Sequence, residues 1–150
     1  MKTTAQYGKK ADRALGMWVK LARACARFEQ LTGEDIRRYG VTPAQFGALE
    51  TLGHVGPLTL GELCKKQLVS GGNMTVVVDN LEKEGLVERI PGKEDRRMIR
   101  VQLTTKGKKL FDEIFVQHAK KVADLASVLT EQEQEELGRL LKKLGTSLQK

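Results

Sequence analysis

The stretch from residue 58 to residue 89, LTLGELCKKQLVSGGNMTVVVDNLEKEGLVER, contains the signals that decide the fold. Thr59 and Glu62 have the spacing of a capping box, which predicts that a short helix begins between them. After a break near residues 68–69, Ser70 can cap a second helix that ends before Gly85. Apolar residues recur at three- and four-residue steps and would form the buried faces: Leu60, Leu63 and Cys64 on the first helix, and Met74, Val77, Val78 and Leu81 on the second.

The hydrophobic period changes directly after the second helix. Residues 86–90 alternate between two faces, and so do residues 98–103. The intervening residues 91–97 are mostly charged. This pattern predicts a two-stranded hairpin with a charged tip, called the wing below.

Further helices are predicted on both sides of this segment. Residues 10–38 carry the apolar stripe of a long amphipathic helix. Thr42, followed by Pro43, forms a capping box that opens the helix preceding residue 58. Thr104 can cap a long helix after the wing, and Thr130 opens a last one.

The expected fold class is mainly α with a small β-hairpin wing (α+β), in a single domain that spans residues 1–150. A winged helix-turn-helix core would occupy about residues 42–104, between long helices at about residues 10–38 and 105–150. So small a core cannot cover the apolar stripes of the long helices, above all the last stripe, which comprises Leu137, Leu140, Leu141, Leu144 and Leu148. We therefore expect these helices to form the dimerisation region of a homodimer.

The charge balance favours a polyanionic partner. Lys and Arg number 26 against 19 Asp and Glu, which gives a net charge of +7. No run of about 18 apolar residues occurs, and the first residues lack the apolar core of a signal peptide. We therefore expect a cytoplasmic protein that does not bind membranes.

The reactive residues do not form a cofactor, metal or catalytic site. Cys25 and Cys64 lie far apart without a CxxC spacing, which predicts free thiols. His54 and His118 have no further ligands at suitable spacing, so we expect no metal and no cofactor. The sequence has no nucleophile elbow and no phosphate-binding glycine loop, and these absences argue against an enzyme.

The second helix of the quoted stretch has a face suited to the major groove of DNA. If its apolar face points inward, the opposite face, which includes Val76 and Asp79, points outward. Small residues at its start would let the backbone approach DNA, and amide and hydroxyl groups would reach base edges. The candidate DNA-binding residues are Ser70, Gly71, Gly72, Asn73, Thr75, Val76 and Lys83. Residues 70–73 taken alone fit a simple turn and cap equally well.

The tip of the wing carries charged residues that suit the minor groove, whose negative potential attracts arginine: Lys93, Asp95, Arg96 and Arg97. Asp95 would orient one of the guanidinium groups. In isolation such a tip is also typical of a solvated turn. A winged helix can serve instead as a protein–protein interaction module, but the position directly after a helix-turn-helix favours contact with DNA.

Residues 41–107 resemble the MarR family of bacterial and archaeal regulators. The resemblance rests on the stretch quoted first and on EDRRMIRVQLTTKG, residues 94–107, where a DRR-like turn precedes a strand ending in LT and the opening of a helix. It implies a sequence-specific regulator of transcription that binds double-stranded DNA, specifically a ligand- or oxidant-responsive repressor that binds a near-palindromic operator as a homodimer. It also implies that residues 70–83 form the recognition helix and that Arg97, rather than Arg96, enters the minor groove.

The resemblance also implies where an effector would act. Trp18, Tyr39, Phe46 and Phe111 would line a cavity between the dimerisation helices and the winged helix-turn-helix, where many family members bind aromatic acids, although each is more simply a core residue. The start of the recognition helix is similar to that of members that respond to phenolic compounds, quinones or oxidants. Some members sense oxidants through a first-helix cysteine, so Cys25 is a candidate redox sensor. The simpler interpretation of both cysteines is that they are small buried apolar residues.

Overall fold

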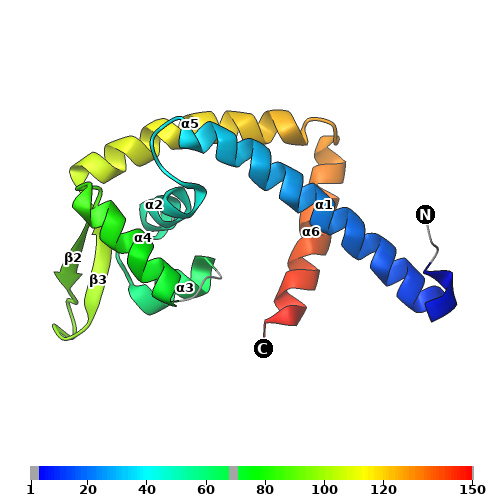
Figure 1. Cartoon of the computed structure of the whole chain (residues 1–150), viewed down its shortest axis with the longest axis horizontal. Coiled ribbons are helices and arrows are strands. Elements are labelled where there is room, and N and C mark those ends of the chain that lie inside the picture. The colour runs from blue at the N-terminus through cyan, green and yellow to red at the C-terminus, as the bar shows by residue number, and fades with distance from the viewer. Residues whose placement is uncertain (1–3, 68–70, 150) are drawn as a thin grey trace.

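The computed structural model describes residues 4–67 and 71–149 (Figure 1). A short 3-10 helix, η1 (Ala5–Tyr7), comes first. The elements that follow are α1 (Lys9–Arg37), α2 (Pro43–Val55), β1 (Leu58–Thr59), α3 (Leu60–Gln67), α4 (Gly71–Lys83), β2 (Val87–Pro91), β3 (Ile99–Leu103), α5 (Thr105–Ala126) and α6 (Glu131–Leu148). The predicted class, mainly α with a small β-hairpin, is confirmed. The predicted break at residues 68–69 and the predicted cap Ser70 lie outside the described residues.

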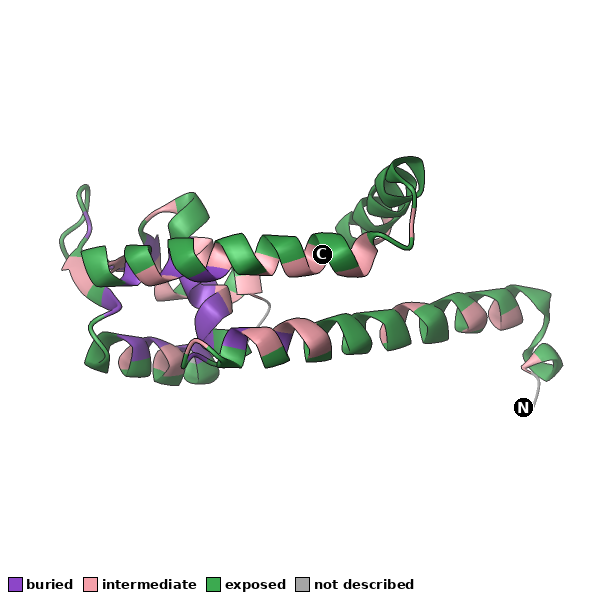
Figure 2. Ribbon diagram, turned by 90° about the horizontal axis from the view of Figure 1, so that it is seen from above, coloured by how far each residue is buried: buried purple, intermediate pink, exposed green. Residues whose placement is uncertain are grey.

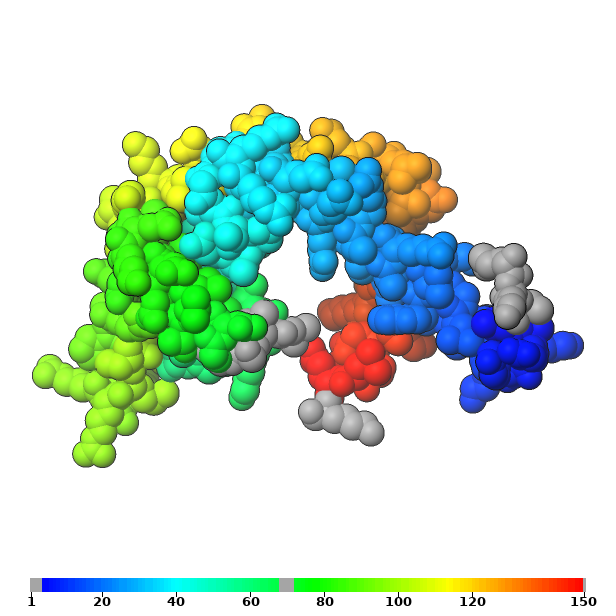
Figure 3. Space-filling view, viewed as in Figure 1, coloured from blue at the N-terminus to red at the C-terminus, as the bar shows by residue number. Residues whose placement is uncertain are grey.

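The chain has the form of an arch (Figure 1). α1 and α5 pack against each other, and α2, α3, α4 and the sheet lie beneath one end of this pair. At the other end the N-terminal half of α1 projects, and α6 turns back from the end of α5. Figure 3 shows the hollow that separates α6 from the helix-turn-helix. The two ends of the arch are therefore structurally separate and can carry different functions.

Four threonines fix the starts of four helices, as the sequence predicts. Thr42 accepts a hydrogen bond from the N–H of Gln45, whose side chain accepts one from the N–H of Thr42. Thr59 and Thr130 form the same reciprocal pairs with the glutamates three residues later, and Thr104 accepts from the N–H three residues later. Such caps satisfy N–H groups that have no partner inside the helix.

The sheet has three strands rather than the two that were predicted. Its order is β1-β3-β2, all antiparallel, and Arg89 of β2 lies opposite Val101 of β3. β1 pairs Leu58 with the other side of Val101. Two residues are too few to show an alternating pattern, and the pairing depends on a partner more than forty residues away, so this strand was missed.

The hydrophobic core lies where α2, α3, α4 and the sheet meet α5 and the last turns of α1. Figure 2 shows buried residues gathered at this end, while α6 and the N-terminal half of α1 are largely exposed. The predicted buried faces of α3 and α4 are confirmed: Leu63, Met74, Val78 and Leu81 are buried, and Leu60, Cys64 and Val77 pack against them. Of the α6 leucines that the sequence assigned to an interface, Leu137, Leu140, Leu141 and Leu148 are exposed in the single chain and Leu144 is half-buried.

Gly107, in the first turn of α5, brings this helix against the residue that precedes β2. A β-carbon at Gly107 would lie 1.8 Å from the carbonyl oxygen of Leu86. That oxygen also accepts a hydrogen bond from the N–H of Thr104 (3.1 Å). Because both the oxygen and the helix are held in place, only glycine fits at this position.

We expect the substitution Gly107→Ala to lower the free energy of unfolding by about 3 kcal/mol or more, because the new methyl group overlaps backbone that cannot move away. Gly61→Ala is the matched control, since Gly61 lies in α3 with open space around its Cα. There alanine should leave stability unchanged or raise it slightly. Urea unfolding followed by circular dichroism at one protein concentration would measure both, and equal stability of the two variants would contradict this account.

Candidate nucleic-acid interface

The exposed face of α4 begins with small residues and open space. A β-carbon added to Gly72 would meet no atom within 4 Å, and Asn73 is exposed. One turn later Val76 is 59% exposed, which is unusual for an apolar side chain in a helix that is otherwise well packed. Lys83 is exposed at the last turn, and Thr75 lies half-buried at the flank. The outward placement predicted for this face is therefore confirmed, with Gly71 at the first position of the helix.

Asp79 lies on the outward face as predicted, with a side chain that is 47% exposed, and its carboxylate also binds a neighbouring strand. Its Oδ1 accepts a hydrogen bond from Nη2 of Arg89 on β2, at 2.6 Å. Arg89 also donates from Nη1 to Oε1 of Glu82 (2.9 Å) and from its backbone N–H to Oε2 of Glu82 (3.2 Å). The hydrogen bond with Asp79 is the main cause that raises the pKa of the Arg89 guanidinium. This three-residue contact, called the Arg89 clamp below, was not predicted from the sequence.

The wing tip is held by hydrogen bonds of its own backbone. The N–H of Gly92 donates to the carbonyl of Met98 (2.6 Å), and the N–H of Met98 donates to the carbonyl of Asp95 (3.1 Å). The carboxylate of Asp95 accepts from the backbone N–H of Arg97 (2.9 Å). Asp95 therefore orders the turn by binding its backbone. The sequence predicted that it would bind a guanidinium group instead.

The side chains at the tip project into solvent. Lys93, Asp95, Arg96 and Arg97 are all exposed, and the tip extends beyond the body of the protein at the lower left of Figure 3. Because Asp95 fixes the backbone at Arg97, the direction in which that side chain leaves the turn is also constrained. The structure thus keeps the four wing residues named from the sequence together at one projecting point.

Two further cations lie next to the recognition helix. Lys65 and Lys66 are exposed in the last turn of α3, which packs against α4. They were not among the predicted site residues. They lie at the end of the helix that precedes α4, and this position in the sequence is the signal that could have identified them.

The four predicted effector residues have different surroundings in the single chain. Phe46 and Phe111 are core residues, 2% and 5% exposed, and Tyr39 packs against the core. Trp18 is 60% exposed on the projecting half of α1. The shared cavity stays a prediction, because Trp18 lies on a part of α1 that the core of the single chain does not cover.

Histidine and phenylalanine rings instead line the junction of α2 and α5. The ring of His54 stands edge-on to Phe111 and Phe115, with ring centres 5.3 and 4.8 Å apart. The ring of His118 stands edge-on to Phe46 at 5.0 Å. The position of His118 on the apolar line of its helix was the sequence signal for this packing, and the contribution of His54 was missed.

The two cysteines differ from each other in exposure. Cys64 is half-buried against the core, as its position on the apolar face of α3 predicts. Cys25 is exposed, so its predicted inward position is wrong for the single chain. In the described part of the chain, residues 23–30 of α1 are all exposed.

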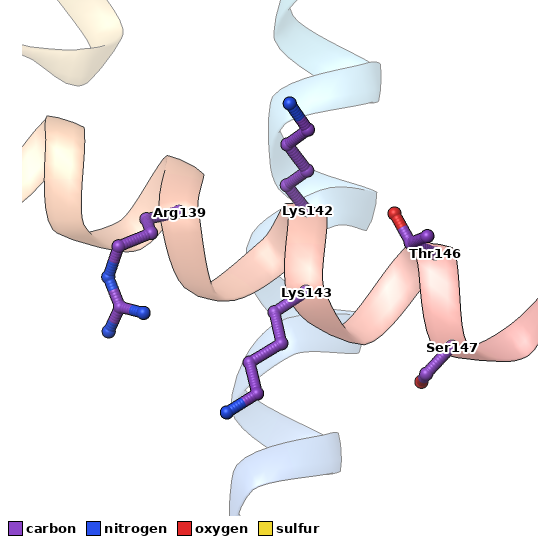
Figure 4. Close-up of a pocket in the computed structure, with 5 residues that line it drawn as sticks. All are labelled: Arg139, Lys142, Lys143, Thr146 and Ser147. Atoms are coloured by element: carbon purple, nitrogen blue, oxygen red, sulfur yellow. The ribbon is translucent and has the colours of Figure 1, made fainter.

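A shallow depression runs along α6 and is shown in Figure 4. It is lined by residues of this one helix: Arg139, Lys142, Lys143, Thr146 and Ser147. In the figure the side chains of Lys142 and Thr146 leave one side of the helix and the other three leave the opposite side. Arg139 is already bound to Glu136, with two contacts of 2.7 Å. No second element encloses the depression, so it is part of the helix surface rather than a ligand site.

The part of the chain that the structure describes contains no cluster of three or more His, Cys, Asp or Glu side chains able to bind a metal ion. Within residues 4–67 and 71–149, no helix has the length and apolar character required to span a membrane.

Known proteins share this arrangement. The sequence profile of the MarR family matches residues 39–98. The HTH-type transcriptional regulator MhqR of Bacillus subtilis is 34% identical over 134 residues, which cover 89% of this chain and 92% of that protein. A cysteine-to-serine mutant of Escherichia coli MarR, solved in complex with operator DNA, has a TM-score of 0.78 at 28% identity, covering 88% of this chain and 95% of its own.

A further solved structure is that of Bordetella bronchiseptica BpsR, whose DNA binding is regulated by 6-hydroxynicotinic acid. It has a TM-score of 0.75 at 25% identity and covers 83% of this chain and 89% of its own. These proteins are regulators of transcription and not enzymes. Since the similarity to MhqR extends over nearly the full length of both proteins, the chain belongs to the MarR family of DNA-binding transcriptional regulators.

Proposed function

We propose that the protein binds a specific sequence of double-stranded DNA as a homodimer, with α4 in the major groove and the wing tip in the adjacent minor groove. The observation that carries this proposal is the open, small-residue face of α4 beside a projecting tip that presents Arg97. Two such units related by a two-fold axis would read a near-palindromic operator with half-sites about one helical turn apart. Occupation of that site excludes other proteins from the same DNA, so we infer that the regulator acts as a repressor.

In this proposal the whole chain acts as one functional domain. The segment of about residues 42–104 reads DNA, and the helices at about residues 10–38 and 105–150 hold the two copies together. On the DNA side, the contacts come from two groups of residues. The recognition helix supplies Ser70, Gly71, Gly72, Asn73, Thr75, Val76 and Lys83, and the wing supplies Lys93, Arg96 and Arg97, with Asp95 ordering the turn.

Substitution of one residue in each group distinguishes a contact that binds any DNA sequence from a contact that recognises specific bases. Arg97→Ala removes a cation from the minor groove, so the affinity should fall on every DNA sequence, and the slope of log K against log salt should become shallower by about one unit per wing. Asn73→Ala removes an amide group from the major groove. It should weaken the specific site by about 1–3 kcal/mol per lost contact and leave the salt slope almost unchanged.

Titration of operator and scrambled duplexes at several salt concentrations measures both effects. Arg38→Ala is the control, because Arg38 is an exposed guanidinium that directly follows α1 and belongs neither to α4 nor to the wing. It should change neither affinity nor slope. If Arg97→Ala also left both unchanged, the wing would not contact DNA, and a protein–protein interaction module would be the better assignment.

The apolar surfaces at the other end of the arch support the homodimer. Large apolar side chains on α1 and α6 are exposed in the single chain: Leu15, Met17, Trp18, Val19, Phe28, Leu137, Leu140, Leu141 and Leu148. The charges on these helices are complementary. α6 begins with Glu131, Glu133, Glu135 and Glu136, whereas the first two thirds of α1 carry Lys9, Lys10, Arg13, Lys20, Arg23 and Arg27. A second copy therefore offers both an apolar and an electrostatic match.

We expect the double substitution Leu140→Glu with Leu144→Glu to convert the dimer to monomers, because burying two carboxylates in an apolar interface is unfavourable. The matched control is Lys142→Glu with Thr146→Glu, which places the same two side chains on the opposite side of α6. Light scattering would report the mass of each variant. A leucine variant that stayed dimeric and helical would exclude this stripe from the interface.

We also infer that an aromatic or phenolic effector, or an oxidant, weakens DNA binding. The rings of Phe46, His54, Phe111, Phe115 and His118 lie where α2 meets α5, so an aromatic molecule entering this junction would alter the packing that positions the helix-turn-helix. The regulation of BpsR by 6-hydroxynicotinic acid supports the aromatic class. Cys25 is the candidate for oxidant sensing, but it lies in the middle of α1 and is not one of the residues at the junction of α2 and α5. We therefore favour the aromatic effector.

Peroxide treatment tests this choice. If the effector is aromatic, wild-type protein and the Cys25→Ser variant should keep the same affinity for operator DNA after exposure to peroxide, as measured by fluorescence anisotropy. Cys64→Ser serves as the control for the half-buried thiol. Release of the wild type by peroxide, with Cys25→Ser still bound, would instead establish Cys25 as an oxidant sensor.

A further inference from the structure

The Arg89 clamp differs from the other ion pairs of the described residues because it joins two different elements. Between the described residues, each of the other ion pairs joins side chains three or four positions apart in the sequence. The guanidinium of Arg89, on β2, binds Asp79 and Glu82, both on α4, at 2.6 and 2.9 Å. The wing and the recognition helix are therefore linked directly by charge as well as through the core.

The place of the clamp along the hairpin is important. At the base of the wing, Leu86 and Val87 are buried in the core. Beyond Arg89, residues 93–99 are all exposed, so the core holds the base of the hairpin and not its tip. Arg89 lies between the buried base of the hairpin and its exposed tip. A contact there joins the hairpin to α4 just before the exposed tip.

The exposure of the clamp indicates that it contributes little to stability. The side chains of Arg89, Asp79 and Glu82 are 30%, 47% and 41% exposed. Ion pairs as accessible as these are screened by water and salt, and most stabilise the folded state only slightly. Their loss should therefore leave the fold intact, and a different role is needed to explain a guanidinium that bridges two carboxylates.

The clamp also changes the charge that α4 presents. Asp79 and Glu82 are carboxylates on the helix that approaches DNA, where they would repel phosphates. Arg89 neutralises part of this charge. Charge neutralisation and geometric positioning are separate effects, and Arg and Lys differ in their ability to provide them, because only the planar guanidinium has a fork of donors that can bind two carboxylates in fixed directions.

We propose that Arg89 is a positioning residue for DNA binding: by bridging Asp79 and Glu82 it fixes the wing relative to the recognition helix, so that the helix and Arg97 at the wing tip engage DNA as one rigid unit. This inference rests on the proposed function, because it assigns Arg89 an effect that is exerted through Arg97. It predicts that the contribution of Arg97 to affinity depends on Arg89.

A double-mutant cycle on operator DNA measures that dependence. In the wild-type background we expect Arg97→Ala to weaken binding by about tenfold, and in an Arg89→Met background by no more than about twofold, because a wing that is no longer held contributes little through its tip. Met keeps much of the length of the side chain and removes the charge. Arg38→Met, at the exposed ion pair with Asp35, is the matched background in which Arg97→Ala should keep its full tenfold effect.

The variant Arg89→Lys separates the two effects of the clamp. Lysine restores the positive charge but not the fork, so we expect it to recover part of the lost affinity and to leave the effect of Arg97→Ala small. If Arg89→Lys restored both the affinity for DNA and the full effect of Arg97→Ala, charge alone would matter and the positioning role would be overturned. Thermal unfolding of each variant, expected to differ little from the wild type, shows that the protein remains folded.

The outcomes distinguish this inference from the proposed function. If Arg97→Ala has no effect in the wild-type background, the wing does not contact DNA and the proposed function fails. If Arg97→Ala weakens binding equally in the wild-type and Arg89→Met backgrounds, the proposed function stands and the positioning role of Arg89 is wrong.

Discussion

The burial of one face of α4 is the constraint on which the rest of the structure depends. Met74, Val78 and Leu81 enter a core shared with α2, α3, the sheet and α5, and burying such side chains is worth about 1.5–3 kcal/mol each. With that face fixed, the opposite face can point in only one direction. The sheet packs on the same core, so the wing that extends from it has a defined direction as well. The surface that we propose to meet DNA is thus a consequence of how the core is packed.

Signals between neighbouring residues made most of the fold predictable from the sequence. A capping threonine and its partner are three residues apart, so the starts of the helices at Thr42, Thr59 and Thr130 could be identified before any tertiary contact was known. The apolar steps along α3 and α4 likewise identified their buried faces. The projecting wing followed from the change in hydrophobic period and the charged residues between its strands.

Contacts between residues distant in the sequence were not predictable in the same way. Helical spacing placed Asp79 on the outward face, but only the fold brings Arg89 close enough to bind it. The strand β1 depends on Val101, and the exposure of Cys25 and Trp18 depends on where α1 leaves the core. An apolar stripe in a sequence shows that a surface needs a partner, and it does not show whether that partner is the same chain.

The length of α5 has a consequence for how this protein can change in evolution. Its 22 residues form a rod about 33 Å long that is anchored in the core by Phe111 and Ile114 and continues to the turn before α6. Because each helical residue rotates the chain by about 100°, inserting one residue in α5 would swing the leucines of α6 away from their original direction relative to α4. Inserting about seven residues, close to two full turns, would nearly restore that direction while moving α6 farther away. Insertions in α5 therefore preserve the relative orientation of α4 and α6 only when they add close to a whole number of helical turns. The length of α5 thus fixes the direction of α6 relative to α4.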